Sequence, residues 1–581
     1  MPWNIILYND GVNPGDSKGV NQSRKCITFY WSFLELGMRY LCYEECWFEL
    51  TTVRSDGCVS NLPGGITQIA AEALMTFFQP GRDVERDGIQ LKIDNEVVDF
   101  WAKIGGNLGD IPAIKDVLSC KGHSGIKPCV ICQNHVVPTS DAYAHLLARS
   151  TYAVGPECVD VAQLMIHTDA TIRELAIELR DIHKLVRPDD FEFKEQMYGL
   201  THTMYSPLLH ERLQLKAIST LMYDWGHMYV CDGIGDRELG ICMATLKAAR
   251  AKSTYSEFKD YSTKFKWPAI SKDAIDRLFT NKHNAKYYKN WDFSSTASEF
   301  LSLVPVLLCY FIRVVQPRGD CADVVDSFIK VLMVIEALQC VKRGLVTPSI
   351  LQQLIHSHLQ AFMKAYGGKY VRRKHHYVLH LPDMLLRFGC LIATFTHERK
   401  HRGVKRECRP RQNLKNWEVG VVESLTVHRL HLMSGPWVHA YLVNARKPMR
   451  RDVRVLDDIF PNARGGIEVS KRVETMNGSI AANDVVLYRW VHGELAVGKL
   501  LINAKVDGAY RAAVTKWTLL PRDRAVAGQM DNMIAEYQCD DAGMVIDAAA
   551  LEAALVHRPS DDGAICTVVL PPEYRNLPLA N

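Results

Sequence analysis

The chain is organised around residues Leu108 to Cys132, LGDIPAIKDVLSCKGHSGIKPCVIC. Asp110 stands there after a glycine and shortly before Pro112, which marks a turn. The preceding run VVDFWAKIGG, residues 97–106, is rich in Val, Phe, Trp and Ile, and this composition predicts a strand. An acid just past the end of a strand can project its carboxylate into a cleft. Asp110 is therefore a candidate functional residue.

A Cys-x-x-Cys pair, Cys129 and Cys132, follows on a loop of the same stretch. Two thiolates across a tight turn can share one tetrahedral metal, so this spacing predicts half of a zinc site. Cys120 and His123 precede the pair with Cys-x-x-His spacing, and His135 follows it, so the site could be closed locally. The alternative is that these cysteines are reduced and buried without a metal.

The composition is that of a soluble globular protein with more than one domain. The chain has 581 residues, 48% of them hydrophobic and 23% charged, which predicts two or three domains. Its net charge of +4 is nearly neutral, so any nucleic-acid surface is expected to be a local patch.

The chain's 17 cysteines are scattered, and its start, MPWNIILYND, lacks the pattern of a secretion signal. Free thiols in a reducing compartment are therefore expected. The longest apolar run, Phe300–Ile312, contains Pro305 and is too short to span a bilayer. It predicts a buried helix, and no association with a membrane is expected.

The first hundred or so residues predict strands and one helix in a definite order. NIILYNDG predicts a strand that ends at Asp10, and CITFYWSFLEL and CWFELTTVRS predict two more strands. ITQIAAEALMTFFQP predicts a helix, and the strand before Asp110 follows it. The expected order is strand, strand, strand, helix, strand.

These motifs together resemble the central region of cut-and-paste DNA transposases of the CACTA (En/Spm) type and their Plavaka-like relatives. GDIPA, KGHSG and PCVIC are similar to that region, and Asp224-Trp225-Gly226-His227 is similar to the family's Asp-x-x-His. The later passage KHHYVLHLP, followed by Phe-Gly and an acid, resembles a further family motif. The resemblance covers roughly residues 5 to 435.

The resemblance implies an RNase H-like α/β core, a mixed sheet with flanking helices, interrupted by a large all-α insertion. It implies a catalytic triad of Asp10, Asp110 and Glu398 that binds two Mg²⁺ or Mn²⁺ ions. Hard cations of this kind prefer carboxylate oxygens. Taken singly, Asp10 could instead be a turn residue, Asp110 a helix N-cap and Glu398 a partner of nearby arginines and lysines.

The family keeps both the Cys-x-x-Cys and the Asp-x-x-His, which implies a structural zinc. The implied ligands are Cys129, Cys132, His123 and His227, with Cys120 as the alternative. Asp224 would then orient His227 or approach the catalytic metals.

Six segments are expected along the chain. Helical periodicity dominates the middle, and residues 484–520 alternate as short antiparallel strands do. The segments are 1–158, the first part of the core with the Cys-x-x-Cys loop; 159–386, the helical insertion; 387–444, the return to the core with the last acid and a helix; 445–480, a linker; 481–525, a small β-barrel-like domain; and 526–581, a C-terminal tail.

The densest basic run, residues 399–415, flanks the last expected acid. Such a run binds phosphates with little sequence preference, and the alternative is a solvated charged face. The residues expected to contact DNA are Arg399, Lys400, Arg402, Lys405 and Arg406. The implied partners are DNA, both transposon ends and target, and further copies in a homo-oligomer, and the implied location is the nucleus.

The function implied is therefore that of a DDE-type DNA transposase, or a protein derived from one, that cleaves and joins DNA strands. The alternative is a catalytically inactive, domesticated protein that binds DNA or chromatin. Full-length relatives carry sequence, often a DNA-binding module, ahead of the first strand, and this chain has almost none there. A fragment, a partial gene model and a domesticated copy all fit that departure.

Overall fold

The computed structural model describes residues 2–14, 25–56, 58–122, 126–136, 150–155, 158–411, 415–434, 440–450, 452–453, 456, 466–490, 493–521 and 532–580. The chain forms two compact units. The first unit comprises Met1–Tyr229 and Val341–Gly435, and the second comprises Val230–Cys340 and Pro436–Asn581.

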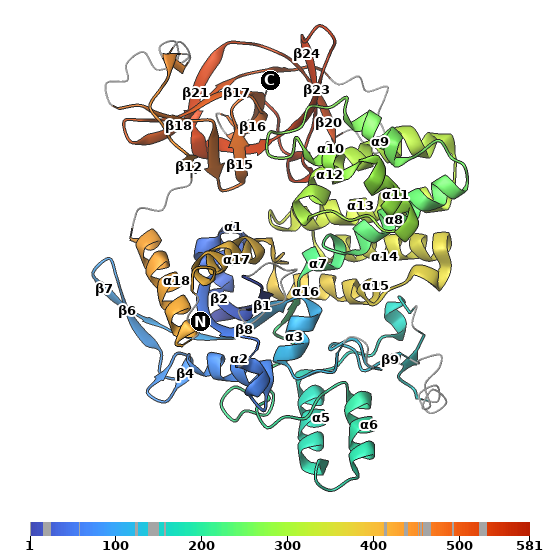
Figure 1. Ribbon diagram of the computed structural model, residues 1–581, viewed down its shortest axis with the longest axis vertical. Helices are drawn as coiled ribbons and strands as arrows, with labels where there is room; N and C mark the ends of the chain where they lie inside the picture. The colour runs from blue at the N-terminus through green and yellow to red at the C-terminus, as the bar shows by residue number, and fades with distance from the viewer. Residues whose placement is uncertain are drawn as a thin grey trace. The chain divides into compact units, whose positions relative to one another are not determined.

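A mixed five-stranded sheet lies at the centre of the first unit (Figure 1). Its order is β11-β8-β1-β2-β3. β1, β2 and β3 pair antiparallel, whereas β8 runs parallel to β1, and β11 runs parallel to β8. The strands are β1 Trp3–Val12, β2 Cys26–Phe33, β3 Phe48–Arg54, β8 Ala102–Gly109 and β11 Leu221–Tyr223.

The helices of the first unit come from both parts of its chain. The first part contributes α1 Gly37–Leu41, α2 Gly65–Met75, α3 Ile111–Val117, α5 Asp169–Ile182, α6 Pro188–Tyr198 and α7 Trp225–Tyr229. The second part contributes α14 Pro348–Tyr366, α15 Arg373–Tyr377, α16 Leu381–Phe388, α17 Phe395–Cys408 and α18 Trp417–Met433. Asp110, Thr168 and Thr347 cap α3, α5 and α14 by accepting backbone N–H bonds, the usual role of Asp and Thr at a helix start.

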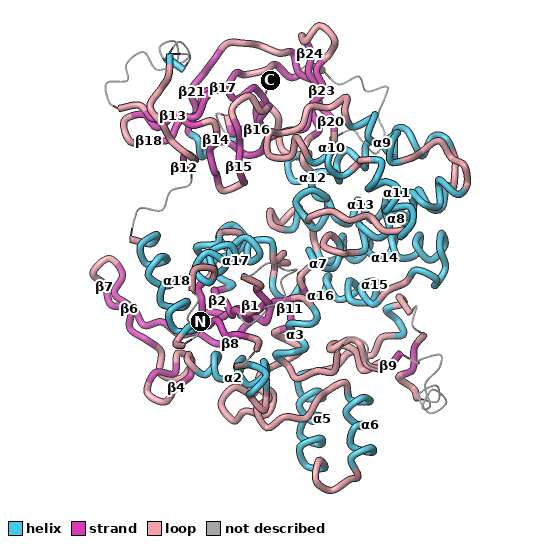
Figure 2. The backbone as a smooth tube through the Cα atoms, viewed as in Figure 1, coloured by secondary structure: helices cyan, strands magenta, loops and turns pink. Residues whose placement is uncertain are grey.

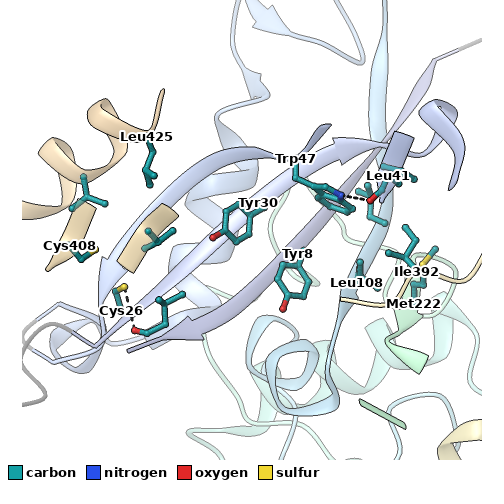
Figure 3. Packing of buried hydrophobic residues seen from close by; sticks show 14 of the residues in the cluster. Tyr8, Cys26, Tyr30, Leu41, Trp47, Leu108, Met222, Ile392, Cys408 and Leu425 are labelled. Carbon is teal, nitrogen blue, oxygen red and sulfur yellow. Dashed lines mark hydrogen bonds between the residues drawn. The ribbon is translucent and has the colours of Figure 1, made fainter. Parts of the chain in front are cut away.

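Side chains that alternate along β1 bury both faces of the sheet. Ile6 and Tyr8 lie in one apolar cluster with Val404 of α17 and Trp417 of α18. Figure 3 shows part of this cluster, with the Tyr8 and Tyr30 rings on neighbouring strands.

Ile5 and Leu7, the alternate residues of β1, lie in a second apolar cluster that includes Ile69 and Leu74 of α2. The first unit is therefore a sheet between two helical layers, an α/β arrangement, as predicted.

The run 97–106 differs from the single strand predicted for it. β7, Glu96–Phe100, pairs back on β6, Ile89–Ile93, as a separate hairpin, and β8 begins only at Ala102. Asp94 and Asn95 at the hairpin turn have positive φ, which suits a tight two-residue turn. Two further strand pairs are short: β4 Phe78–Gln79 with β5 Arg82–Asp83, and β9 His135–Val136 with β10 Ala153–Val154.

The second unit combines helices from the middle of the chain with strands from its end (Figure 2). The helices are α8 Ile234–Ala248, α9 Tyr255–Ser262, α10 Ala274–Leu278, α11 Asn281–Asn290, α12 Ala297–Tyr310 and α13 Ala322–Val341. The strands are β12 Ala440–Val443, β13 Glu468–Ser470, β14 Arg472–Thr475, β15 Gly478–Ala481, β16 Val485–Arg489, β17 Leu495–Val506, β18 Ala509–Thr515, β19 Thr518–Leu519, β20 Ile534–Gln538, β21 Gly543–Asp547, β22 Leu551–Ala554, β23 Val556–Pro559 and β24 Ile565–Val569.

These strands pair antiparallel in three sheets, β12-β14-β15, β21-β18-β17-β16-β22 with β13 on β17, and β19-β20-β24-β23.

The observed boundaries differ from the expected segments in three places. β11 lies inside the predicted helical insertion 159–386 but belongs to the central sheet, and the part of that insertion after Val341 belongs to the first unit. β13 and β14 lie in the predicted linker 445–480, and β20 to β24 lie in the predicted tail 526–581. These strands are three to five residues long, too short to carry a clear periodic signal. Their pairing with other parts of the chain makes them strands.

The apolar run at Phe300–Ile312 forms a buried helix, as predicted. α12 buries Phe300, Leu303 and Val304, and Pro305 lies inside it. The stretch Ala297–Arg318 is long and apolar enough to cross a membrane by length and composition, and 61% of its most apolar window is buried within the protein.

Candidate functional site

Three aspartates lie at one edge of the central sheet. In the register of β1 with β8, Asp10 and Asp110 fall opposite each other, just past the last paired residues. In the register of β8 with β11, Asp224 is the residue next to Asp110. Because β1, β8 and β11 run parallel, their carboxyl ends present these acids together. β1 itself continues past Asp10 to Val12 along β2, so the predicted end of the strand at Asp10 was wrong.

Asp10 is held by two donors. The hydroxyl of Tyr8 donates to Oδ2 at 3.0 Å and the N–H of Gly11 donates to Oδ1 at 2.6 Å. Nδ1 of the buried His401 lies 3.9 Å from Oδ2. Burial, followed by the negative charge of Asp110, raises the pKa of Asp10 to about 6.

Asp110 caps helix α3. Its Oδ1 accepts the N–H of Ala113 at 2.8 Å. The structural role considered from the sequence, a helix N-cap, is therefore real. One oxygen of the cap remains for other partners, because a carboxylate can accept about four hydrogen bonds or metal bonds. The cap fixes one oxygen of Asp110 at the start of α3, directly after β8.

Glu398 lies in the first turn of α17, and its side chain is 43% exposed. Its Oε1 is 3.6 Å from Nε2 of His227. Burial raises the pKa of Glu398, and the nearby charge of His227 partly offsets that rise. The contact with His227 brings Glu398 to the edge that carries Asp110 and Asp224.

His227 lies between two of the acids, Asp224 and Glu398. Nδ1 of its ring pairs with Oδ2 of Asp224. Burial alone would lower the pKa of His227, but Asp224 and the charges of Asp110 and Glu398 raise it to about 9. The raised pKa values of Asp10 and His227 both show that this cluster of acids favours positive charge. A divalent cation would supply such charge, and carboxylate oxygens are its preferred ligands.

A second cluster offers metal ligands of a different kind. Cys129, Cys132, His376 and His380 place one Sγ or ring nitrogen each within 4.8 Å of one another. Nε2 of His380 lies 3.4 Å from the sulfur of each cysteine, and Nε2 of His376 lies 3.4 Å from Sγ of Cys132.

Two thiols and two imidazoles form a donor set that fits tetrahedral zinc. Both cysteines and His380 are buried. Although burial opposes ionisation, the Cys132 thiol and the two imidazoles lower the pKa of Cys129 well below its ordinary value. A metal such as zinc is therefore compatible with this cluster.

The structure corrects the expected zinc ligands. His227, implied as a ligand by the resemblance, instead lies with Asp224 and Glu398. Cys120 is outside the described cluster, and burial raises the pKa of its thiol to about 12. His135 bonds to the hydroxyl of Ser150 at 2.8 Å. His123 lies outside the described residues.

His376 and His380 were missed as ligands. The signal was present, because KHHYVLHLP places two histidines four residues apart, one helical turn, at a helical stretch. Nothing local connects them to a loop some 250 residues earlier in the chain, so only the folded chain brings the two halves together.

The basic residues of α17 divide into a buried and an exposed set. Lys400 is 5% exposed, and its Nζ pairs with Glu49 at 2.6 Å, so the expectation that it faces DNA was wrong. Arg399 is 44% exposed and pairs with Glu44 at 3.3 Å. The three remaining residues lie at exposed or half-buried positions and are Arg402, Lys405 and Arg406.

No protein-family model matches this sequence, and no curated protein matches it either.

Proposed function

We propose that the protein is a DDE-type DNA transposase, or a protein derived from one, with an RNase H-like core in its first unit. The observation that carries the proposal is the sheet β11-β8-β1-β2-β3 with Asp10 and Asp110 in register at the ends of its neighbouring parallel strands. The return of the chain at α17, with Glu398 in contact with His227 at that edge, supports the third member of the triad.

In this proposal Asp10, Asp110 and Glu398 hold two Mg²⁺ or Mn²⁺ ions. Such ions would supply charge to activate an attacking oxygen and to stabilise a leaving one. The raised pKa of Asp10 supports a cation at this place, because a positive charge beside two neighbouring carboxylates favours the ionised form of both.

The reaction proposed is in-line displacement at a DNA phosphorus. In cleavage, the oxygen of water forms the new P–O bond and gives up a proton. The bond to the 3′ oxygen breaks, and that oxygen takes up a proton and leaves as the strand's 3′-hydroxyl. In strand transfer, that 3′-hydroxyl gives up its proton and forms a new P–O bond at a target phosphate. The 3′ oxygen of the target strand is the leaving group, and it takes up a proton. Tyr8 and Gly11 keep the carboxylate of Asp10 oriented through both steps.

The second cluster is proposed to bind a structural Zn²⁺ through Cys129, Cys132, His376 and His380. It ties the loop at residues 129–132 to residues 376–380 across the first unit. We also propose that the exposed Arg402 and Arg406 and the half-buried Lys405 bind DNA phosphates, and that the protein acts in the nucleus as a homo-oligomer.

The test is Mg²⁺-dependent or Mn²⁺-dependent cleavage of supercoiled plasmid and of linear duplex DNA by the purified full chain. Asp110→Asn and Glu398→Gln should each lower the cleavage rate by at least about 100-fold while DNA affinity is kept. Glu407→Gln is the matched control, because it removes the same charge from the same helix at a residue that pairs with Arg406.

Cleavage by Glu398→Gln at the rate of the unaltered protein would remove Glu398 from the triad. Binding of DNA without cleavage by the unaltered protein would contradict the transposase proposal and support the non-catalytic DNA-binding protein instead.

A further inference from the structure

Asp224 is the acid of the sheet edge that the triad leaves out. It follows β11 directly, next to Asp110 in register, and its side chain is fully buried. By position alone it would be a fourth metal ligand. Its hydrogen bonds indicate a different role.

Four donors occupy the two oxygens of Asp224. Oδ1 accepts the N–H of Gly226 at 2.8 Å and the N–H of Thr394 at 3.2 Å. Oδ2 accepts the hydroxyl of Thr394 at 2.5 Å and pairs with Nδ1 of His227. A carboxylate has about four acceptor positions, so this one has none left for a metal ion.

Two of the three residues bound to Asp224, Thr394 and His227, also contact Glu398. Thr394 precedes α17, and its carbonyl accepts the N–H of Glu398 at 3.0 Å, in the first turn of the helix. His227 reaches the same side chain from the other direction, with Nε2 at 3.6 Å from Oε1 of Glu398. The hydroxyl of Thr394 makes no cap bond to α17, so its bond goes to Asp224 instead.

Close packing between α7 and the start of α17 supports this connection. A Cβ added at Gly226 would come within 2.9 Å of the Phe395 ring, so a larger residue there would push the two segments apart. The Trp225 and Phe395 rings pack edge to face with centroids 5.7 Å apart. The first turn of α17 is therefore held against the segment that follows Asp224.

We propose that Asp224 is a positioning residue that holds the carboxylate of Glu398 in place through Thr394 and His227, and that it is not itself a metal ligand. The inference rests on the proposed function, because it assigns Glu398 to the metal-binding triad. The fully buried carboxylate ties the end of β11 to the returning helix, so the third acid is placed only when α17 docks.

The test measures Mn²⁺ affinity of the full chain, from the free Mn²⁺ signal in electron paramagnetic resonance, for the unaltered protein, Asp224→Asn, Glu398→Gln and the double variant. Asp224→Asn should weaken Mn²⁺ binding by about tenfold or more, the usual effect of losing a residue that orients a ligand. In the Glu398→Gln background the same substitution should have almost no further effect.

Thr394→Val serves where Asp224→Asn fails to fold, because it removes only the hydroxyl and keeps the shape of a buried, branched side chain. It should weaken Mn²⁺ binding several-fold. Thr396→Val is the matched control, because that buried hydroxyl donates to the carbonyl of Cys42 at 3.2 Å and not to Asp224, and it should leave the affinity unchanged.

Two outcomes overturn the inference alone. They are an unchanged affinity in folded Asp224→Asn or Thr394→Val, and a loss in the double variant equal to the two single losses combined, which would make Asp224 an independent ligand. Mn²⁺ binding that is absent in the unaltered protein or unaffected by Glu398→Gln would instead overturn the proposed metal site, and the inference with it.

Discussion

Among the acids at the edge of the sheet, Asp10 has a clearly raised pKa. The pKa of its carboxyl is about 6 in the folded protein, against an ordinary value of 3.8, because of burial and the charge of Asp110. The folded state therefore holds a proton on Asp10 that the unfolded state has already lost between about pH 4 and pH 6. By linkage, this residue makes the folded state less stable as the pH rises through that window.

Asp10→Asn should remove that dependence. Without divalent metal, the melting temperature of the variant relative to the unaltered protein should rise between pH 4 and pH 6 and then level off, because the variant no longer ionises. The measurement is thermal unfolding at several pH values in a chelator. A difference in melting temperature that stays constant between pH 4 and pH 6 would show that the neighbours of Asp10 do not raise its pKa. In a separate measurement, added Mn²⁺ should stabilise the unaltered protein but not the variant.

At the scale of single elements, α17 combines three roles on different sides of one helix. Glu398 faces His227, Lys400 pairs with Glu49 in the interior, and Arg402 is exposed. His401, next to Lys400, approaches Asp10. The basic run at residues 399–415 therefore does not form a single functional patch, because α17 packs on the sheet and turns its residues to different surroundings.

Lys400→Met and the double variant Arg402→Ala/Lys405→Ala should separate these roles. Lys400→Met removes one of the positive charges that pair with the buried carboxylate of Glu49. It should lower the free energy of unfolding by on the order of 3 kcal/mol and leave DNA affinity nearly unchanged.

The double variant should keep stability and weaken DNA binding at every sequence, with the slope of log K against log salt reduced by roughly 2. Chemical unfolding and binding titrations at several salt concentrations measure both. Weaker DNA binding in folded Lys400→Met alone would contradict the assignment.

At the scale of the whole molecule, the Cys129, Cys132, His376 and His380 cluster belongs entirely to the first unit. It joins segments from both parts of that unit's chain. Each unit has apolar clusters of its own, so each is expected to have its own unfolding transition.

Purified protein should contain about one zinc, and removing it with a strong chelator should lower one unfolding transition by more than about 5 °C and leave the other in place. Cys129→Ser/Cys132→Ser should do the same, whereas Cys120→Ser should retain the zinc. Metal analysis together with scanning calorimetry measures this. Zinc-free native protein, or an equal shift of every transition, would contradict a structural zinc in the first unit.

Local chemistry alone predicted a good part of the central sheet. Apolar runs and turn residues predicted β1, β2, β3 and α2, because strand and helix periodicity is a property of neighbouring residues. The prediction that Asp110 directly follows a strand is confirmed, and the helix N-cap considered as its alternative role is also present, since Asp is favoured at a helix start and Pro in its first turn. The Cys-x-x-Cys pair likewise identified half of a metal cluster without any knowledge of the fold.

The tertiary structure decided which distant residues complete these local features. Cys132 and His376 are 244 residues apart, and no sequence spacing links them. His227 was assigned to the cysteines by motif order, but the end of β11 carries it to the acidic edge beside Asp224. Lys400 is buried because α17 packs against the sheet on that side. Such contacts depend on how elements pack, and packing is set by the whole chain at once, whereas periodicity, caps and short metal-ligand spacings are set within a few residues.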